Sequence, residues 1–200
     1  MQLIVESSNM NDYLIETEEV DHSHHSIVEK AAELSNNARS EIEFVQAAFE
    51  FVRDQVFHSA DIGSSRVTYK ASDILQHNEG LCYAKSILLG ALLRNKGIPA
   101  GFCYQKLAYG DTPEAGHALH GLNAIYLNTL NKWIRLDARG NKAGINAQFS
   151  IDKEQLAFPI RSHCGDIDYP TIYIRPNQNL ITILKQAANG SELHLPSELV

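Results

Sequence analysis

The stretch HNEGLCYAKSILLGALLRNKGIPAG (residues 77–101) decides the fold, because a cysteine on a glycine turn is followed at once by a strongly periodic helix. Apolar side chains recur there at i, i+3, i+4, i+7 and i+8, at Ala84, Ile87, Leu88, Ala91 and Leu92. Gly97 and Pro99 end the pattern, since glycine favours a helix C-terminus and proline cannot continue a helix. The stretch predicts a core helix whose first turn holds Cys82.

The position of Cys82 suits a nucleophile. A thiolate attacks far better than a thiol, and an unperturbed cysteine titrates near ~8.5. The N-terminus of a helix carries partial positive charge on unpaired N–H groups, which favours the thiolate and stabilises an oxyanion formed on attack. Gly80 lets the backbone turn sharply before the helix. A buried, inert cysteine that begins a helix is the alternative interpretation, and this segment alone does not decide between them.

Helical patterns also precede the cysteine, over residues 27–34 and 41–56, with a short helix expected over 71–77. Residues 57–70 are punctuated by Ser, Gly and Asp and are expected to be irregular. Three strands are expected after it, over residues 100–107, 119–127 and 132–136, with a loop over 109–116. The apolar runs 171–174 and 180–184 are too short to assign.

Helices followed by antiparallel strands favour an α+β fold over a doubly wound parallel sheet. We expect one domain over residues 1–200, with its core at about 44–140 and residues 141–200 as a C-terminal extension of that domain.

A cysteine nucleophile needs a base, and the base needs a partner that orients it. If the loop between the last two strands is residues 128–131, His120 and Asp137 share a face as diagonal neighbours, ~7–8 Å apart or somewhat less between Cβ atoms. A loop of three or five residues would put them on opposite faces, because a slip of one residue turns every side chain over. His117, of opposite parity, is the rival base.

These residues carry a family resemblance. EGLCYAKSILLGALLRNKGIPAG resembles the nucleophile segment of the transglutaminase-like superfamily, and HGLNAIYL with KWIRLD resembles its later His–Trp–Asp segment. AFEFVRDQV resembles the helix that precedes the nucleophile in bacterial members. The resemblance implies a papain-like fold, in which a helical part with the cysteine packs on an antiparallel sheet with the histidine and the aspartate.

The resemblance also implies roles. Cys82 becomes the nucleophile, His120 rather than His117 the general base and later acid, and Asp137 the residue that orients the imidazole. Papain-like enzymes place an oxyanion donor upstream, where Tyr69 and Gln55 are candidates, and Trp133 is expected to pack near the site. The sequence departs from the family pattern at Leu122, Gly101 and Ala138, where an aromatic residue, Arg and Pro are common. These departures bear on substrate binding more than on the chemistry.

The expected reaction is acyl transfer at carboxamide or peptide bonds through a thioester, with hydrolysis by a peptidase or deamidase favoured. The expected substrate is a peptide or protein with an amide or glutamine group. A protein-glutamine amine transferase shares every step except the second nucleophile. A non-catalytic interaction domain on the same fold is the third reading. No metal or organic cofactor is required.

Composition limits the other classes. The 200 residues are 44% hydrophobic and carry a net charge of −7, which argues against nonspecific binding of nucleic acid because such binding needs clustered Lys and Arg. Three cysteines are too few for a secreted disulfide scaffold. The first residues lack a signal-peptide pattern, and no apolar run is long enough to span a membrane. We therefore expect a soluble, cytoplasmic protein.

Overall fold

The centre of the molecule is a four-stranded antiparallel sheet with strand order β6-β5-β4-β7. A computed structural model describes residues 1–190 and 193–199. The strands of this sheet are β4 (Ala100–Ala108), β5 (His117–Leu127), β6 (Lys132–Leu136) and β7 (Ile167–Asp168). Two short parallel pairs lie outside it, β1 (Ile4–Val5) with β8 (Thr171–Ile172) and β2 (Phe57–His58) with β3 (Glu79–Gly80).

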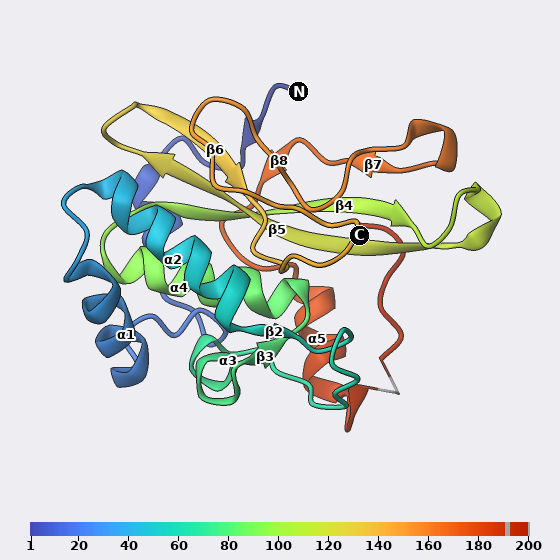
Figure 1. The fold of residues 1–200 in the computed structure, drawn as a ribbon, viewed down its shortest axis with the longest axis horizontal. Coiled ribbons are helices and arrows are strands. Elements are labelled where there is room, and N and C mark those ends of the chain that lie inside the picture. The colour runs from blue at the N-terminus through green and yellow to red at the C-terminus, as the bar shows by residue number, and fades with distance from the viewer. Residues whose placement is uncertain (191–192, 200) are drawn as a thin grey trace.

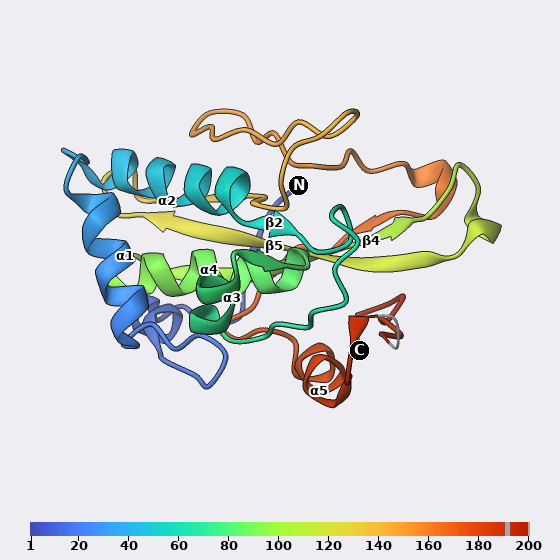
Figure 2. The same ribbon diagram turned by 60° about the horizontal axis from the view of Figure 1, so that its bottom comes forward.

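The helices gather on one side of the sheet around α4 (Cys82–Asn95), as Figures 1 and 2 show. α4 packs against β4 and β5, and three other helices pack against α4. These are α1 (His25–Ser35), α2 (Glu41–Gln55) and α3 (Ala71–His77). The remaining helical segments are the 3₁₀ turns η1 (Met10–Leu14), η2 (Pro113–Ala115) and η3 (Ser162–Cys164), and helix α5 (Gln178–Gln186).

α4 is buried on all sides from Tyr83 to Arg94, including two cations that the sequence pattern placed among its polar positions. Lys85 donates through Nζ to the carbonyls of Val56 (2.5 Å) and Arg53 (3.2 Å). Arg94 donates to the carbonyl of Ala100 and to carbonyls of distant segments. These bonds satisfy the buried cations. They also tie α4 to the end of α2, to the N-terminal segment and to segments that follow α4.

The sheet register agrees with the hairpin predicted from the sequence. Leu127 pairs with Lys132 and Tyr126 with Trp133, which leaves the four-residue loop 128–131. The Glu41 carboxylate in the first turn of α2 accepts hydrogen bonds from the backbone and side chains of Asn128 and Thr129 at 2.8–3.1 Å. The loop length is therefore held by a contact with the helical layer.

Most of the expected elements form within two or three residues of their predicted ends. Differences lie in residues 57–70, where β2 forms at the start of the expected irregular segment, and in the unassigned runs. The run 171–174 contributes β8, and the run 180–184 lies within α5, whose Leu180, Ile181 and Leu184 join the main core. In the part of the chain that the structure describes, every helix is too short or too polar to cross a bilayer.

Candidate active site

Cys82 is the first residue of α4, and its side chain lines a cavity of about 610 Å³. The residue before it, Leu81, is the N-cap, and no side chain of the described residues caps the helix. The first N–H groups of α4 therefore lack the intrahelical acceptors that later residues have, and they lie beside the sulfur. The helix end thus supplies hydrogen-bond donors and partial positive charge at Cys82.

Gly80 has a different role from the one expected. Its φ is not positive, so a special turn conformation is not what requires glycine. A Cβ at this position would lie 2.7 Å from the Cβ of Ala84 and 3.1 Å from Oγ1 of Thr68. The absence of a side chain lets β3 pass close to the first turn of α4.

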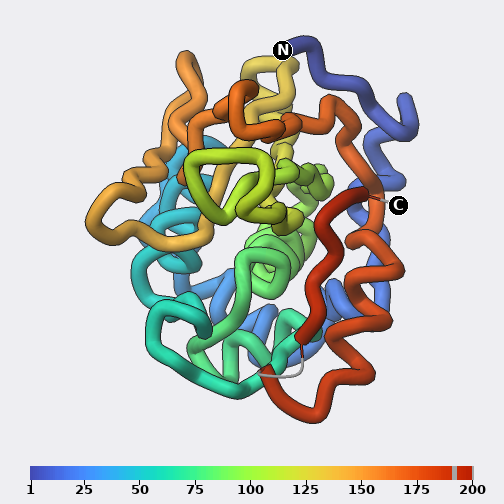
Figure 3. Tube along the Cα trace, turned by 90° about the vertical axis from the view of Figure 1, so that its right-hand side faces the viewer, coloured from blue at the N-terminus to red at the C-terminus, as the bar shows by residue number. Residues whose placement is uncertain are grey.

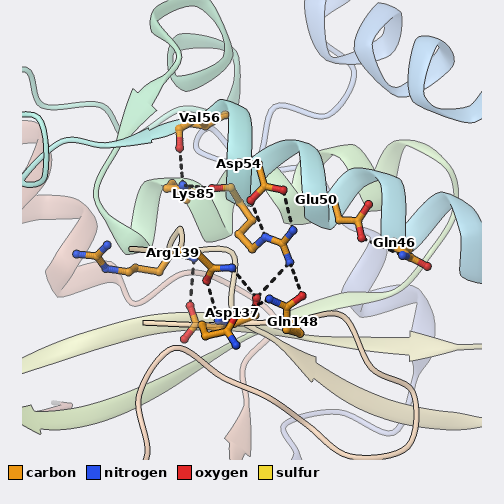
Figure 4. A network of polar contacts seen from close by, with 12 residues as sticks. Gln46, Glu50, Asp54, Val56, Lys85, Asp137, Arg139 and Gln148 are labelled. Carbon is orange, nitrogen blue, oxygen red and sulfur yellow. Dashed lines mark hydrogen bonds and ion pairs between the residues drawn. The ribbon is translucent and has the colours of Figure 1, made fainter. Parts of the chain in front are cut away.

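His120 and Asp137 meet as the register predicted. Nε2 of His120 lies 2.8 Å from Oδ2 of Asp137, and both side chains are buried. Asp137 also accepts the backbone N–H groups of Arg139 (3.2 Å, on Oδ1) and Ala157 (3.0 Å, on Oδ2). Figure 4 shows Asp137 beside the backbone of Arg139, below the end of α2. These bonds fix the carboxylate, which in turn fixes the plane of the imidazole.

The edge of β5 at His120 is open toward α4. β6 ends at Leu136, opposite Asn123, so it does not reach His120. The hydroxyl of Tyr83 in the first turn of α4 donates to the carbonyl of Leu119. A Cβ on Gly121 would lie 2.8 Å from Cδ1 of Tyr83. The glycine thus allows the close packing that brings the β5 edge next to Cys82.

The charges of the site favour a thiolate–imidazolium pair. Burial alone would raise the pKa of the Cys82 thiol, but the charge and hydrogen bond of His120, and then those of His58, lower it to about 6. Burial alone would lower the pKa of His120, but the negative charges of Asp137 and Cys82 raise it to about 10. Burial would raise the pKa of Asp137, but His120 and the two backbone N–H groups hold it below its usual range.

His58 is a site residue that the sequence analysis missed. It lines the same cavity as Cys82 and His120, and it helps to lower the pKa of the Cys82 thiol. Its Nδ1 is buried and has no hydrogen-bond partner among the described residues, the Asp61 carboxylate being 4.0 Å away. Pairing of β2 with β3 holds His58 opposite Gly80, and Gly80 lies two residues before Cys82 in the chain. A lone histidine in a segment without periodicity gave no signal from which this position could be found.

The rival base lies elsewhere. Nε2 of His117 is 3.0 Å from the carbonyl of Cys164, outside the cavity. His117 lies three residues before His120 on β5, so their side chains point to opposite faces of the strand. The structure therefore brings His120, and not His117, to the Asp137 carboxylate.

The structure does not bring the three further candidates to the cavity. The ring of Tyr69 packs against the core, with the ammonium groups of Lys70 and Lys185 5.9 Å and 5.3 Å from its centroid. Gln55 is exposed at the end of α2, because the helix turns its side chain toward solvent. Trp133 stacks edge-on with Tyr13 at 4.9 Å, on the far part of the sheet. The two aromatic residues pack elsewhere, and of the polar residues upstream of Cys82 it is His58 that lines the cavity.

The rest of the cavity wall, beyond Cys82 and His120, is mainly apolar. It is formed by the end of β4, the start of β5 and two later segments. Its apolar members include Leu107, Ala108, Tyr109, Leu119, Phe158, Pro159 and Leu195. The ring of Phe158 stacks edge-on against His120, with centroids 5.1 Å apart. Within residues 1–190 and 193–199, no three His, Cys, Asp or Glu side chains are grouped so that they could hold a metal ion.

Comparison with known proteins identifies the family. The family model of the transglutaminase-like superfamily matches residues 28–138. The chain belongs to the transglutaminase-like superfamily. No curated protein matches it. The match takes in Cys82, His120 and Asp137.

Three solved structures resemble this transglutaminase-like chain. A candidate cysteine protease from Cytophaga hutchinsonii aligns with a TM-score of 0.53 and 20% identity, over 66% of this chain and 43% of that one. A candidate protease from Parabacteroides distasonis aligns with a TM-score of 0.41 and 15% identity, over 62% of this chain and 25% of that one. A structure named as a TGase has a TM-score of 0.44 and 16% identity, over 85% of this chain and 44% of that one.

The transglutaminase-like chain therefore spans less than half the length of these structures. The first alignment bears on the fold, and it agrees with the predicted papain-like arrangement of a helical part on an antiparallel sheet. Membership of the superfamily supports cysteine-based catalysis in general terms.

Proposed function

We propose that this protein is a cysteine-dependent acyl-transfer enzyme that hydrolyses carboxamide or peptide bonds through a thioester. The observation that carries the proposal is the His120–Asp137 bond of 2.8 Å at the wall of a cavity into which Cys82 also opens. Each of the three residues comes from a different element, so a shared structural role does not account for their meeting.

In the first step, the Cys82 thiolate attacks the carbonyl carbon and a C–S bond forms. The imidazolium of His120 gives its proton to the leaving nitrogen, the C–N bond breaks, and an amine or ammonia departs. Asp137 accepts from Nε2–H throughout, which presents Nδ1 to the sulfur and the leaving group. The products of this step are a thioester on Cys82 and a neutral His120.

In the second step, water attacks the thioester. Neutral His120 takes a proton from the water, the C–S bond breaks, and the carboxylic acid leaves while the thiolate–imidazolium pair is restored. An amine in place of water would give the transferase reaction. We favour water because it needs no acceptor site. The mainly apolar wall of the cavity fits an extended peptide as the acyl donor.

Both steps pass through a tetrahedral oxyanion. The free N–H groups at the start of α4 are the first donors to it. We assign His58 as the side-chain donor, because it lines the cavity beside Cys82 and pairing of β2 with β3 fixes its backbone. The His58→Ala variant is expected to lose on the order of 10²-fold in kcat.

Activity-based profiling tests the proposal. A peptidyl electrophile and a glutamine-mimic electrophile are offered to the wild type and to Cys82→Ala, and hydrolysis of peptide amides is followed in parallel. We expect covalent labelling of the wild type at Cys82. We also expect kcat/KM to fall by on the order of 10⁶-fold in Cys82→Ala and in His120→Ala.

A non-catalytic interaction domain gives a different result. In that case iodoacetamide modifies Cys82 no faster near neutral pH than it modifies the buried Cys103, whose pKa burial raises to about 12. Equal rates at these two cysteines would remove the basis for an enzyme.

A further inference from the structure

A segment of the chain itself, LHLPSEL (residues 193–199), lies along the cavity that holds Cys82 and His120. Leu195 is among the residues that line this cavity. Leu193, Leu195 and Leu199 pack against the main core, while His194, Ser197 and Glu198 are exposed. Figure 1 shows this last stretch running from the level of α5 back to β4 and β5, and Figure 3 shows the same path from the side.

The backbone of this segment uses the open edge of β5 beside His120. The N–H of Leu119 donates to the carbonyl of Pro196 at 3.0 Å. Leu119 lies opposite Lys106 on β4, and it directly precedes His120. An open strand edge is the usual place for an extended peptide to add main-chain hydrogen bonds. Segment 193–199 therefore takes a main-chain donor that a peptide entering the site would use.

One exposed and one partly buried polar contact hold the end of the segment. Nζ of Lys106 lies 2.5 Å from the carboxylate of Glu198, whose side chain is 62% exposed. The N–H of Leu199 lies 3.5 Å from the hydroxyl of Tyr169. Exposed ion pairs contribute little to stability, so this pair can be lost without unfolding the core. The rest of the hold comes from Leu193, Leu195 and Leu199, which are only partly buried.

We infer that residues 193–199 are a built-in strap that occupies the part of the active-site groove where a peptide substrate must lie, and that a substrate has to displace it. The inference rests on the proposed function for the identity of the groove. It defines the substrate as an extended peptide, with an apolar side chain in the place of Leu195 and a main-chain carbonyl on the Leu119 N–H.

The test compares two alkylating reagents of different size on the full chain. Iodoacetamide reaches Cys82 without needing the groove, whereas a benzyloxycarbonyl-dipeptidyl chloromethyl ketone needs it. The variants are Glu198→Lys, Lys106→Glu, the double exchange of both, and Leu195→Asp. The matched control is Glu33→Lys, which changes a similarly exposed carboxylate paired with Lys30 on α1.

We expect Glu198→Lys and Lys106→Glu to raise the rate of the chloromethyl ketone by about 2- to 5-fold, the range expected for loss of an exposed ion pair. Leu195→Asp is expected to raise that rate by about 10-fold, because a carboxylate does not stay in an apolar cavity. The double exchange is expected to return to within about 2-fold of the wild type, since it restores opposite charges. The iodoacetamide rates of the Lys106 and Glu198 variants, and both rates of the Glu33→Lys control, are expected to stay at the wild-type value.

Hydrogen exchange at the Leu119 amide gives a readout that does not depend on Cys82 chemistry. Leu195→Asp is expected to speed this exchange, because the Pro196 carbonyl leaves. If the chloromethyl ketone reacts at one rate in all variants while iodoacetamide modifies Cys82 rapidly, the strap is refuted and the proposed function stands. If iodoacetamide fails to prefer Cys82, the proposed function is refuted, and the exchange rate alone decides whether the segment detaches.

Discussion

At the scale of single residues, two histidine side chains and the N-terminus of α4 lower the pKa of the Cys82 thiol. His120, His58 and the first N–H groups of α4 all stabilise negative charge on Cys82, and together they outweigh the cost of burying it. Asp137 takes no part in this contact and acts through His120. These charges favour a Cys82 thiolate paired with a protonated His120.

This charge arrangement predicts the pH dependence of alkylation. The pKa of Cys82 is lowered to about 6, so the iodoacetamide rate should rise with pH to a plateau with its midpoint near that value, and not near the ~8.5 of a free cysteine. In His120→Ala the midpoint should move upward, because burial remains and the largest favourable charge is gone. Rates measured from pH 4 to 10 by mass spectrometry of the Cys82 peptide check this. A wild-type midpoint at or above that of free cysteine contradicts it.

The places of Cys82, His120 and Asp137 in the fold could be predicted because each had its own local signal. Cys82 followed a glycine and opened a periodic helix, and parity on two strands selected His120 and Asp137 as neighbours. His58 could not be found this way, because its place depends on the pairing of β2 with β3, two strands of two residues each. Tyr69 was chosen for its position upstream, and aromatic packing decided its place instead.

At the scale of elements, the contact between α4 and β5 sets the distance between Cys82 and His120. Tyr83, the residue after Cys82, lies against Gly121, the residue after His120. Any change in this contact moves Cys82 and His120 relative to each other. Sequence pattern predicted both elements, but the need for glycine at their crossing could be seen only in three dimensions.

Gly121→Ala tests this crossing. Its Cβ would lie 2.8 Å from the Tyr83 ring, and such overpacking costs about 1–3 kcal/mol of unfolding free energy. Displacement of β5 should also slow alkylation of Cys82 at neutral pH. Urea denaturation and labelling rates measure the two effects. Asp111→Ala, at a side chain that is 99% exposed in the hairpin between β4 and β5, is the control and should stay within about 0.5 kcal/mol. Equal behaviour of the two variants would contradict this account.

Lys85 gives a second prediction at this scale. Burial, and then the charge of Arg139, lower its pKa to about 7. Figure 4 shows its ammonium group reaching the carbonyl of Val56 at the end of α2. In the unfolded chain the pKa returns to ~10.4, so between these values the unfolded state binds more protons and the unfolding free energy rises with pH.

Lys85→Met removes this titration. The unfolding free energy of the wild type, less that of the variant, should therefore grow by roughly 1–3 kcal/mol between about pH 7 and about pH 9. Urea denaturation of both proteins at several pH values measures it. A difference that stays flat or falls over this range would show that Lys85 remains charged in the native state.

At the scale of the whole molecule, the site is assembled from segments far apart in the chain, and ion pairs between side chains join these segments. Asp61, which follows β2, accepts from the buried guanidinium of Arg139 and from Nζ of Lys142, both of which follow β6. The hydrogen bond from Arg139 is the main reason that the pKa of Asp61 lies far below its usual range. The cluster joins the segment that holds His58 to the segment that follows Asp137.

Asp61→Asn should weaken this link. The carboxylate stabilises the native state above its unfolded pKa of ~3.9, and this contribution is lost as pH falls toward the lower native value. At neutral pH the variant should be less stable by roughly 1 kcal/mol, a figure reduced by solvent around the carboxylate. Below about pH 4 the wild type and the variant should converge. Asp111→Asn, whose side chain is 99% exposed beside Arg161, is the control and should match the wild type throughout.

The order of helices and antiparallel strands gave the fold class, and the clear periodicities gave most element bounds. The path of residues 141–200 was beyond sequence reasoning. Its regular elements are short, and its course follows contacts with distant residues, such as those of α5 with the core and of β7 with β4. These long-range contacts cover the sheet and complete the cavity wall.

The Glu41-bound turn at residues 128–131 restricts how this hairpin can change over evolutionary time. Adding or deleting a single residue there would exchange inside for outside along one strand and separate His120 from Asp137, unless a bulge restored the phase. Insertions in this turn should therefore be tolerated in pairs. Relatives that keep the histidine and the aspartate are expected to differ in hairpin length by even numbers.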